Sequence, residues 1–488
     1  MSTTIHLYNG NILRDPVNGT FSTDLTISNG IVVDTKAHGQ EEAIQIDLSG
    51  STAIPGLIDS HMHLIYCSTG LGIDLSGCTS ETEFREKLTQ GIAADTPWLL
   101  ASGWTEEKVG SSPTMNWLPK CTKPVLCYRN DFHTAICNDA LLSLLDVREL
   151  EKLPGGANLS EGIVKEDVLF HHVIPLIPKL TLKDKKSAVD RSISYLHAHG
   201  VTSVGTMEHL NEAIEVLAHV QADKQLRCFV MCLDEPDTRF ISLLDSTKQD
   251  SFFKVIGVKT FLDGTLGSRS AKMYKPWLDD DSRGVWASHA SNGQLSNWIA
   301  QVLKCDLAPV MHAIGDEAVG LALLELSSIP ESVVARIEHG QCIAEKDMYL
   351  LKNRWFGVQP LHQVDDCCIA PVALGTQRSR EMHNWRRMID GGANLSFGSD
   401  WPIAPPHPLD AMQVSILNGL TPHEALVAST INAGVSLQDN AIGHLLQGAA
   451  GDVVVLDCNP LECNWKVTKP TVTMTIQAGK VVYEKEYI

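Results

Sequence analysis

The sequence predicts an α/β protein: a (β/α)₈ barrel with a large insertion after its first strand, together with a small β-sandwich domain formed by both chain ends. Two observations carry this prediction. Segments rich in β-branched residues lie near both termini, and between them apolar strands alternate with helical stretches, as in parallel βα repeats. A length of 488 residues is sufficient for a barrel, an insertion and a small companion domain.

Both chain ends have the pattern of strands joined by turns. Residues 24–33 (DLTISNGIVV) place two β-rich runs around Asn29-Gly30, a dipeptide typical of hairpin turns. Residues 452–457 and 471–483 cluster β-branched residues, the latter around Gly479. We therefore expect residues 1–52 and 441–488 to form one β-sandwich domain and residues 53–440 to form the barrel.

Eight apolar runs in the central region are candidate barrel strands. They are Ala53–Ser60, Val201–Thr206, Arg227–Leu233, Val255–Leu262, Ala308–Ala313, Val334–His339, Trp355–Gln359 and Asn394–Ser399. The stretch from about 64 to 186 is too long for a loop, which predicts an inserted subdomain. Thr421, Pro422 and Glu424 predict a helix that begins with a capping box.

The composition limits the classes of partner. A formal net charge of -19 at pH 7 disfavours binding to nucleic acid and to anionic membrane surfaces, because these partners bind basic patches. The first residues contain no basic run followed by an apolar segment, and no apolar stretch approaches the roughly 18 residues of a membrane span. The 13 cysteines form no Cys-x-x-Cys pair, which indicates reduced thiols. We expect a cytoplasmic protein, with homo-oligomers allowed, that acts on a small molecule.

His61 and His63 close the first predicted strand. Because side chains alternate along a strand, both imidazoles point to the same face, although a lone His-x-His pair is more often packed or exposed than metal-binding. Lys259 lies in the apolar run 255–262, where an unpaired ammonium is costly. Such a lysine extends to solvent, meets a carboxylate or loses its charge.

Three further candidate ligands follow later strands. His312 ends the fifth strand, His339 ends the sixth and Asp400 follows the eighth. Each alone could be an ordinary core or loop residue. Together with the first pair and Lys259 they occupy the carboxyl ends of the strands, where barrel enzymes place their sites. One binuclear metal site accounts for all six positions.

Several motifs make the chain similar to a known family. They are ProGlyLeuIleAspSerHisMetHis (55–63), AsnAspPheHisThrAla (130–135), LysThrPheLeuAspGlyThrLeuGlySerArgSerAla (259–271), HisAlaIleGlyAsp (312–316), ArgIleGluHisGlyGln (336–341), ValGlnProLeuHis (358–362), GlySerAspTrpPro (398–402) and IleGlyHisLeuLeuGlnGly (442–448). The chain resembles the amidohydrolase superfamily, and within it the YtcJ-like branch, amidohydrolase family 3, over nearly its whole length.

The resemblance implies a metal-dependent hydrolase that acts on carbon–nitrogen bonds other than peptide bonds, such as amide, N-acyl, N-formyl or cyclic amide bonds. It assigns the roles as follows: His61 and His63 bind one divalent cation, His312 and His339 bind the other, and Lys259 bridges both after carboxylation by CO₂. Asp400 completes the coordination of the first cation and is the catalytic residue that handles the proton. Imidazole and oxygen ligands both suit zinc. The two cations would activate a water.

Four residues that flank matched motifs are predicted substrate contacts, although each can equally serve packing: His133, Arg269, His362 and Trp401. Two segments depart from the family pattern. AspPheHis (131–133) stands where relatives usually have AspGlyHis, and AlaGlyAsp (450–452) stands where they usually have LysAlaAsp. We expect the first to reshape the substrate pocket and the second to leave the chemistry unchanged.

Three alternative functions remain. A mononuclear aminohydrolase that deaminates a heterocycle is disfavoured by Lys259 and by the absence of a His-x-x-Glu element after His339. A lactone or phosphoester hydrolase would use the same two-metal site, and the ligands do not exclude it. A non-catalytic scaffold would be expected to have lost metal ligands. The substrate itself is not encoded in these motifs, because specificity in barrel enzymes resides in the loops.

Overall fold

A computed structural model describes residues 4–34, 43–68, 72–92, 96–150, 153 and 157–486. Its centre is a barrel of eight parallel strands in a single sheet, with neighbours following chain order. The strands are β8 (Leu57–Met62), β14 (Val201–Glu208), β15 (Arg227–Cys232), β16 (Phe253–Phe261), β17 (Ala308–Ala313), β18 (Arg336–His339), β19 (Trp355–Val358) and β20 (Asn394–Phe397). The first and last strands approach each other, because Ser60 Oγ donates to Ser396 Oγ at 3.1 Å. The predicted barrel is confirmed.

The first predicted strand is two strands in the structure. Residues 53–60 were expected to be continuous, but the chain changes sheets at Gly56: β7 (Thr52–Pro55) pairs with strands of the small β domain, and β8 belongs to the barrel. A Cβ at Gly56 would lie 2.1 Å from Thr202 Oγ1, so the close passage requires glycine. An apolar run in the sequence indicates that the residues are buried, but it does not indicate the sheet to which each half belongs. The prediction of one continuous strand was therefore wrong.

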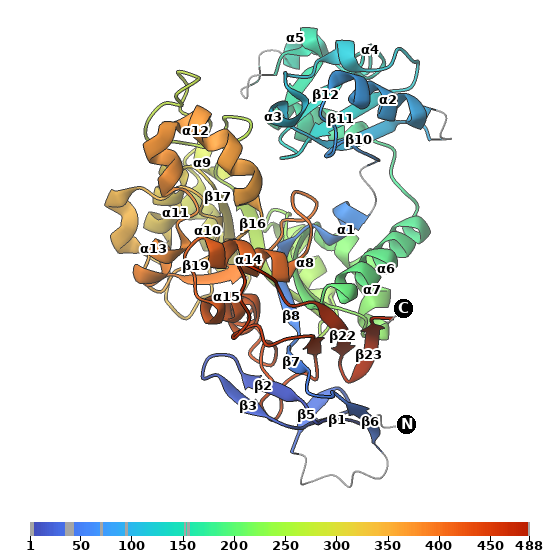
Figure 1. The fold of residues 1–488 in the computed structure, drawn as a ribbon. Coiled ribbons are helices and arrows are strands. Elements are labelled where there is room, and N and C mark those ends of the chain that lie inside the picture. Colours follow the sequence, from blue (N-terminus) through green and yellow to red (C-terminus); the bar gives the residue numbers. More distant parts are fainter. Residues whose placement is uncertain are drawn as a thin grey trace.

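Helices surround the barrel (Figure 1). They are α6 (Leu182–Ala198), α7 (Leu210–Asp223), α8 (Thr238–Ser246), α10 (Leu295–Lys304), α11 (Asp316–Leu326), α12 (His362–Glu381), α13 (Trp385–Asp390), α14 (Pro408–Leu417), α15 (Pro422–Ser429) and α16 (Ile431–Ser436). In α7 the buried residues Ala213, Val216, Leu217 and Val220 follow helical spacing, so one stripe covers the barrel. The capping box at Thr421 and Glu424 is confirmed.

Strands from both chain ends pair in one six-stranded sheet, β23-β22-β21-β7-β2-β3, which lies beside a four-stranded sheet, β5-β4-β1-β6. Their bounds are β1 (Thr4–Tyr8), β2 (Asn11–Asp15), β3 (Thr20–Ser22), β4 (Leu25–Ser28), β5 (Ile31–Val33), β6 (Ile44–Asp47), β21 (Val453–Leu456), β22 (Val472–Gln477) and β23 (Lys480–Glu484). Leu7 and Ile27 of the smaller sheet and Val453 and Ile476 of the larger one share a hydrophobic core. The hairpin at Asn29-Gly30 forms as expected. The domain boundaries at 52 and 441 stay a prediction.

The segment between β8 and α6 contains a separate five-stranded sheet, β13-β12-β11-β10-β9. It comprises β9 (Ile73–Asp74), β10 (Leu99–Trp104), β11 (Val125–Arg129), β12 (Thr134–Cys137) and β13 (Ile163–Lys165), with α2 (Glu81–Ile92), α3 (Glu106–Val109), α4 (Asp139–Leu142) and α5 (Val147–Leu150) around it. Helix α1 (Leu64–Ser68) instead packs against α6 and β14 beside the barrel. Figure 1 shows this sheet at the end of the barrel opposite the small β domain, which is the end where the parallel strands finish.

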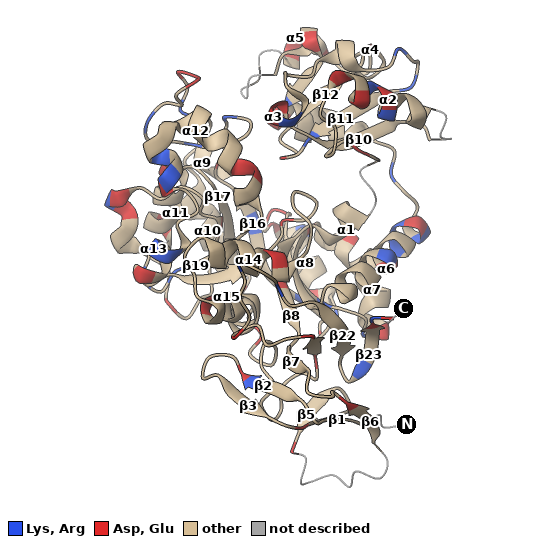
Figure 2. Ribbon diagram, viewed as in Figure 1, with Lys and Arg blue, Asp and Glu red and all other residues tan. Residues whose placement is uncertain are grey.

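Charged residues of both signs occur on the outer helices, for example on α6 and α12 (Figure 2). Among the described helices, none is both long enough and apolar enough to cross a membrane. The thiols are all free, as expected, and Cys367 and Cys368 on α12 are exposed, with their Sγ atoms 3.9 Å apart.

Candidate metal centre

His61, His63 and Asp400 form the first group of possible metal donors, at the carboxyl end of β8. Nε2 of His61 lies 3.2 Å and Nε2 of His63 lies 3.3 Å from Asp400 Oδ1. The backbone holds this arrangement because Asp400 N donates to His61 O at 2.7 Å. A Cβ at Gly398 would lie 2.6 Å from His61 Cβ, so a glycine is needed where the two strand ends meet.

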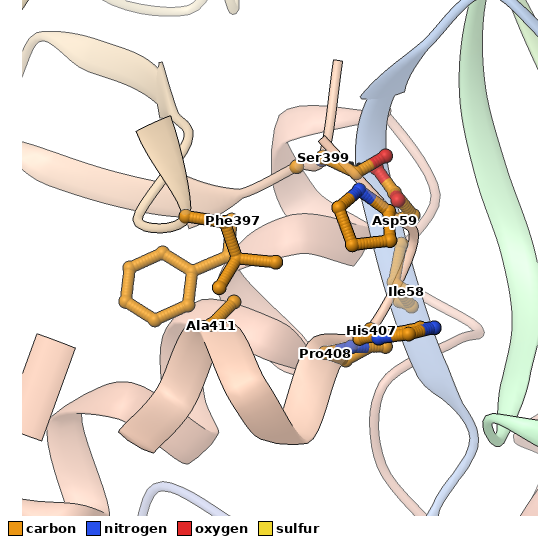
Figure 3. Close-up of a pocket in the computed structure, with 10 residues that line it drawn as sticks. Ile58, Asp59, Phe397, Ser399, His407, Pro408 and Ala411 are labelled. Carbon is orange, nitrogen blue, oxygen red and sulfur yellow. Dashed lines mark hydrogen bonds between the residues drawn. The ribbon is translucent and has the colours of Figure 1, made fainter. Parts of the chain in front are cut away.

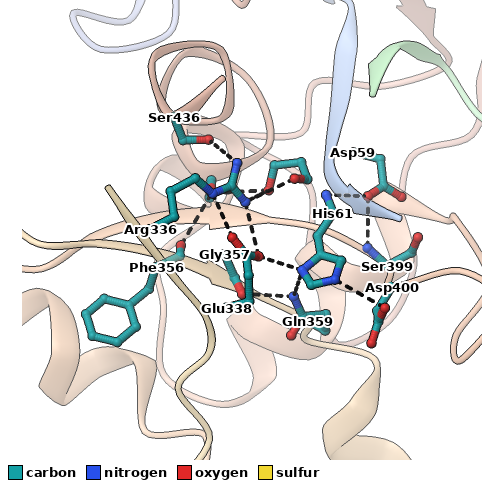
Figure 4. A network of polar contacts seen from close by, with 12 residues as sticks. Asp59, His61, Arg336, Glu338, Phe356, Gly357, Gln359, Ser399, Asp400 and Ser436 are labelled. Carbon is teal, nitrogen blue, oxygen red and sulfur yellow. Dashed lines mark hydrogen bonds and ion pairs between the residues drawn. The ribbon is translucent and has the colours of Figure 1, made fainter. Parts of the chain in front are cut away.

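Glu338 and Arg336 orient His61 from inside the barrel (Figure 4). His61 Nδ1 lies 2.5 Å from Glu338 Oε2, and Glu338 Oε1 accepts from Arg336 Nε at 2.8 Å. A carboxylate accepts hydrogen bonds, so Nδ1 of His61 carries a proton, and Nε2, beside Asp400, is the nitrogen left to face a cation. Burial lowers the pKa of His61, but Asp400 and Glu338 outweigh this effect and leave the pKa raised.

His312, His339 and His362 lie on the other side of Asp400. The ring of His339 is 4.4 Å from that of His312 and 5.1 Å from that of His61, centroid to centroid. His339, His362 and Asp400 form the second group of possible donors, and His362 is the first residue of α12. The structure thus brings His362, predicted as a substrate contact, among the possible donors, while His312, predicted as a ligand, lies outside both groups and contacts His339.

The backbone at two of these positions is left-handed. In a strand, Glu338 and His339 would point to opposite faces, yet both reach the lumen. His339 ends β18 with φ 73°, and this conformation turns its side chain into the barrel mouth. Asp400 has φ 57°. Left-handed non-glycine residues cost about 1–3 kcal/mol each and cluster at functional sites.

His312 is fixed by a backbone carbonyl. Its Nε2 lies 3.1 Å from Gly264 O, and because a carbonyl only accepts, Nε2 carries the proton and Nδ1 is left with a lone pair. Burial lowers the pKa of both His312 and His339 well below the usual value, and the charge on Lys259 acts in the same direction. Both imidazoles are therefore neutral, as metal ligands must be.

Lys259 lies in the barrel lumen, where its charge acts on His61, His312 and His339. It is 4% exposed and forms no salt bridge with any residue that the structure describes. Burial lowers its pKa to about 8, against the opposing effect of Glu338 and Asp400. This explains how an amine in the lumen can lose its proton near neutral pH.

Asp400 is poised as an anion. Burial by itself would raise its pKa, but the neighbouring His61 and His63 hold the pKa well below the usual value. A carboxylate that stays deprotonated between histidines can bind a cation or accept a proton from a group bound nearby.

The predicted substrate contacts separate into two kinds. His133 reaches the site: its ring is 5.9 Å from that of His312, and its Nδ1 pairs with Glu166 Oε2 at 3.0 Å. Arg269 pairs instead with Asp279 at 2.7 Å, and the ring of Trp401 packs 5.9 Å from that of Tyr195 on α6. The structure does not bring these last two side chains to the donors.

Phe132 departs from the family pattern at a position where the backbone favours glycine. Its φ is 58°, a conformation that glycine adopts without strain. The ring packs 5.2 Å from Tyr128 and 6.0 Å from Tyr66, which offsets the cost of the left-handed backbone. An aromatic side chain therefore stands beside His133, and its effect on the substrate pocket stays a prediction.

A hollow of about 250 Å³, including its open mouth, lies between residues of β8, β20 and α14 (Figure 3). Asp59, Phe397, Ser399 and His407 are among the residues that line it, and none of the predicted metal ligands does. Its walls are largely apolar. The donor chemistry, rather than this hollow, marks the site.

Two buried histidine nitrogens among these donors have no hydrogen-bond partner among the described residues, which favours a bound cation. His339 Nδ1 and His362 Nε2 are buried, and neither has a hydrogen-bond partner in the described part of the chain. Such groups are costly unless they bind something. Two donor groups that share Asp400 therefore suit divalent metal ions.

Two functional carboxylates escaped the sequence analysis, Glu338 and Glu166. Arg336 and Glu338 alternate along the short buried strand β18, and this inward-facing charge pair was the available signal for Glu338. Glu166 follows β13 in the insertion, and no local pattern connects it with His133, 33 residues earlier.

The chain is similar to known proteins over most of its length. The chain is 28% identical to LONG AFTER FAR-RED 3 of Arabidopsis thaliana, over 97% of this chain and 91% of the relative. It is 25% identical to YtcJ of Bacillus subtilis (strain 168), with 92% of each covered, and 21% identical to an N-substituted formamide deformylase of Arthrobacter pascens, with 93% of each covered.

Among solved structures, a metal-dependent hydrolase from Pyrococcus horikoshii OT3 superposes with a TM-score of 0.76 at 26% identity, covering 95% of this chain and 99% of that one. A model of the amidohydrolase family matches residues 45–483. This chain is a member of the amidohydrolase family.

Proposed function

We propose that the protein hydrolyses a non-peptide carbon–nitrogen bond, in an amide, N-acyl, N-formyl or cyclic amide substrate, with two divalent cations. The observation that carries the proposal is the pair of donor groups, His61, His63 and Asp400 on one side and His339, His362 and Asp400 on the other. The similarity to a formamide deformylase supports the choice of bond.

In this proposal His61 and His63 hold one cation, and His312 and His339 hold the other. Their imidazoles together with carboxylate oxygens suit zinc. Lys259, once carboxylated by CO₂, would serve both cations as their shared ligand, because a carbamate replaces a costly buried ammonium with an anion. Bound cations would supply a water of lowered pKa and polarise the substrate carbonyl.

The chain's own residues orient the reactants and move the proton. Glu338 holds Nδ1 of His61 and so leaves Nε2, 3.2 Å from Asp400 Oδ1, to face a cation. Asp400 accepts the proton of the attacking water and returns it to the leaving nitrogen. His133 faces the substrate from the insertion, and His362 on α12, which belongs to the second donor group, faces it beside the second cation.

The test combines metal analysis with a substrate panel. Purified protein is expected to carry close to two divalent ions per chain, and chelation should abolish activity without unfolding the barrel. With zinc added, we expect turnover of N-acyl, N-formyl or cyclic amide substrates. One ion with deamination of a heterocycle, or turnover of lactones or phosphoesters alone, would assign the site to another reaction.

Variants separate the roles. Lys259→Ala should lose metal and activity together, and a short carboxylic acid should partly restore both, whereas Lys254→Ala in the same strand, which removes a lysine paired with Asp439 at 2.7 Å, should change neither. Asp400→Asn should keep most metal but lose activity by a factor on the order of 10² or more. A density map of active, metal-loaded enzyme with an unmodified Lys259 ammonium paired to a carboxylate would contradict the bridging role.

A further inference from the structure

The carboxylate of Asp131 joins the turn between β11 and β12 of the insertion to the barrel loop after β16, where Thr134 Oγ1 also lies 2.8 Å from Ser268 Oγ. Asp131 Oδ2 accepts from Thr265 Oγ1 at 2.8 Å and from Ser268 Oγ at 2.7 Å, both in the loop that follows β16. Asp131 Oδ1 accepts from the backbone N of His133 at 3.2 Å. A single side chain therefore holds the barrel loop and the turn that carries His133.

The same loop holds a predicted metal ligand. Gly264, the residue before Thr265, provides the carbonyl that accepts from His312 Nε2 at 3.1 Å. The loop is closed by its own hydrogen bonds, from Thr265 N to Ser270 Oγ at 3.0 Å and from Ser268 N to Thr265 Oγ1 at 3.3 Å. Because these hydrogen bonds close the loop, a displacement of Thr265 or Ser268 moves the whole loop, including Gly264.

Asp131 is not needed simply to neutralise its neighbour. It lies 3.1 Å from Arg129 Nη1, but Arg129 also pairs with Glu106 at 2.9 Å and with Glu107 at 3.6 Å. Nor is it the only polar contact that docks this turn, since Asn130 Nδ2 donates to Asp365 Oδ2 on α12 at 3.1 Å. The side chain of Asp131 is only 13% exposed. Its distinctive contacts are those with Thr265 and Ser268.

We propose that Asp131 is a positioning residue of the metal centre: it fixes the loop 264–268, keeps the Gly264 carbonyl against His312, and thereby makes the inserted subdomain part of the site. This inference rests on the proposed two-cation function. The hydrogen bond to Gly264 sets which nitrogen of His312 is free for a cation, and partners of this kind change metal affinity by about 10–100-fold when they are removed.

The test compares neighbouring variants in the full-length protein. Asp131→Asn removes the anion that two hydroxyl groups share, while Asn130→Ala removes a docking contact that does not involve the loop. Zinc content is measured over a range of buffered free zinc, together with kcat, KM and the circular dichroism spectrum. We expect Asp131→Asn to bind one of its two cations about 10–100-fold more weakly and to lose kcat more than KM changes, with the spectrum retained.

Ser268→Ala, which removes one donor to Asp131, should shift the same cation in the same direction by less, and it provides the test if Asp131→Asn does not fold. Asn130→Ala should bind both cations as the parent does. Parental affinity for both cations in Asp131→Asn or, if that variant does not fold, in Ser268→Ala would overturn the inference. An equal loss of cation affinity in Asn130→Ala would also overturn the inference, because any weakened contact between the turn and the barrel would then have the same effect. A parent protein that never holds two cations would instead refute the proposed function.

Discussion

At the scale of single residues, the metal centre depends on the backbone as much as on ligand identity. The positions of His61, Lys259, His312, His339 and Asp400 were predictable, because each follows or lies within an apolar strand and parallel strands bring their carboxyl ends together. The approach of His362 was not, since it depends on where α12 begins relative to the barrel. Strand alternation alone would also have directed His339 away from the lumen, and its φ of 73° reverses this.

Glu338 gives a prediction at this scale. Glu338→Gln replaces the anion 2.5 Å from His61 Nδ1 by a neutral amide. The His61 ring should then be held less firmly, and its Nε2 should become less basic. We expect affinity for the cation at His61 and His63 to drop by about 10–100-fold, as measured by zinc titration. The matched control is Glu208→Gln, a buried carboxyl at the end of β14 that accepts from Ile65 N at 2.8 Å. Equal losses in the two variants would remove any special role for Glu338.

At the scale of elements, strand existence was predictable and strand pairing was not. Seven of the eight barrel strands lie within or close to their predicted ranges, because a buried parallel strand is a continuous apolar run. The first run failed at Gly56, where close contact with Thr202 separates two sheets. The insertion was recognisable by its length alone, and its five-stranded sheet was not, since its strands are short and irregularly spaced.

Helix α6 gives a pH prediction. His197 is buried against the barrel, its Nε2 donates to Gln225 O at 2.9 Å, and burial lowers its pKa to about 4, although that hydrogen bond and Asp452 oppose the shift. The pKa of His197 in the folded protein lies below the unfolded value of about 6.5, so the unfolded chain binds this proton first as the pH falls. The stability that comes from keeping His197 neutral is therefore fully present above pH 6.5 and is lost as the pH falls toward about 4. Between pH 7 and 4.5 the loss should reach about 2–3 kcal/mol.

The measurement is the urea midpoint of the parent and of His197→Gln at both pH values. Glutamine can donate to the same carbonyl but does not titrate, so the variant should lose less stability on acidification. Other buried carboxyls titrate equally in both proteins and cancel in the comparison. Identical losses would show that His197 does not contribute to acid sensitivity.

At the scale of the whole molecule, a buried ion pair joins the barrel to the sheet made from both chain ends. Arg227 begins β15 and Asp452 precedes β21, and their side chains, each 5% exposed, meet with Nε 2.6 Å from Oδ2. Asp452 Oδ1 also accepts from Ala478 N at 2.7 Å. The AlaGlyAsp motif (450–452), which differs from the family pattern, thus retains the aspartate that links the barrel to this sheet. The link lies far from the candidate metal donors.

Removing one partner of this pair should be more costly than removing both. Asp452→Ala leaves the Arg227 guanidinium buried without its carboxylate, and such a change costs about 3–5 kcal/mol, whereas replacing both partners by apolar residues of similar volume is often close to neutral. We therefore expect the urea midpoint to fall strongly in Asp452→Ala and much less in the double variant Arg227→Met/Asp452→Leu. Metal content should stay at the parental value in the folded double variant, because the pair lies at the opposite end of the barrel from the donors. A double variant as unstable as Asp452→Ala would show that the hydrogen bonds to Asp452, rather than the charge of Arg227, hold the two parts together.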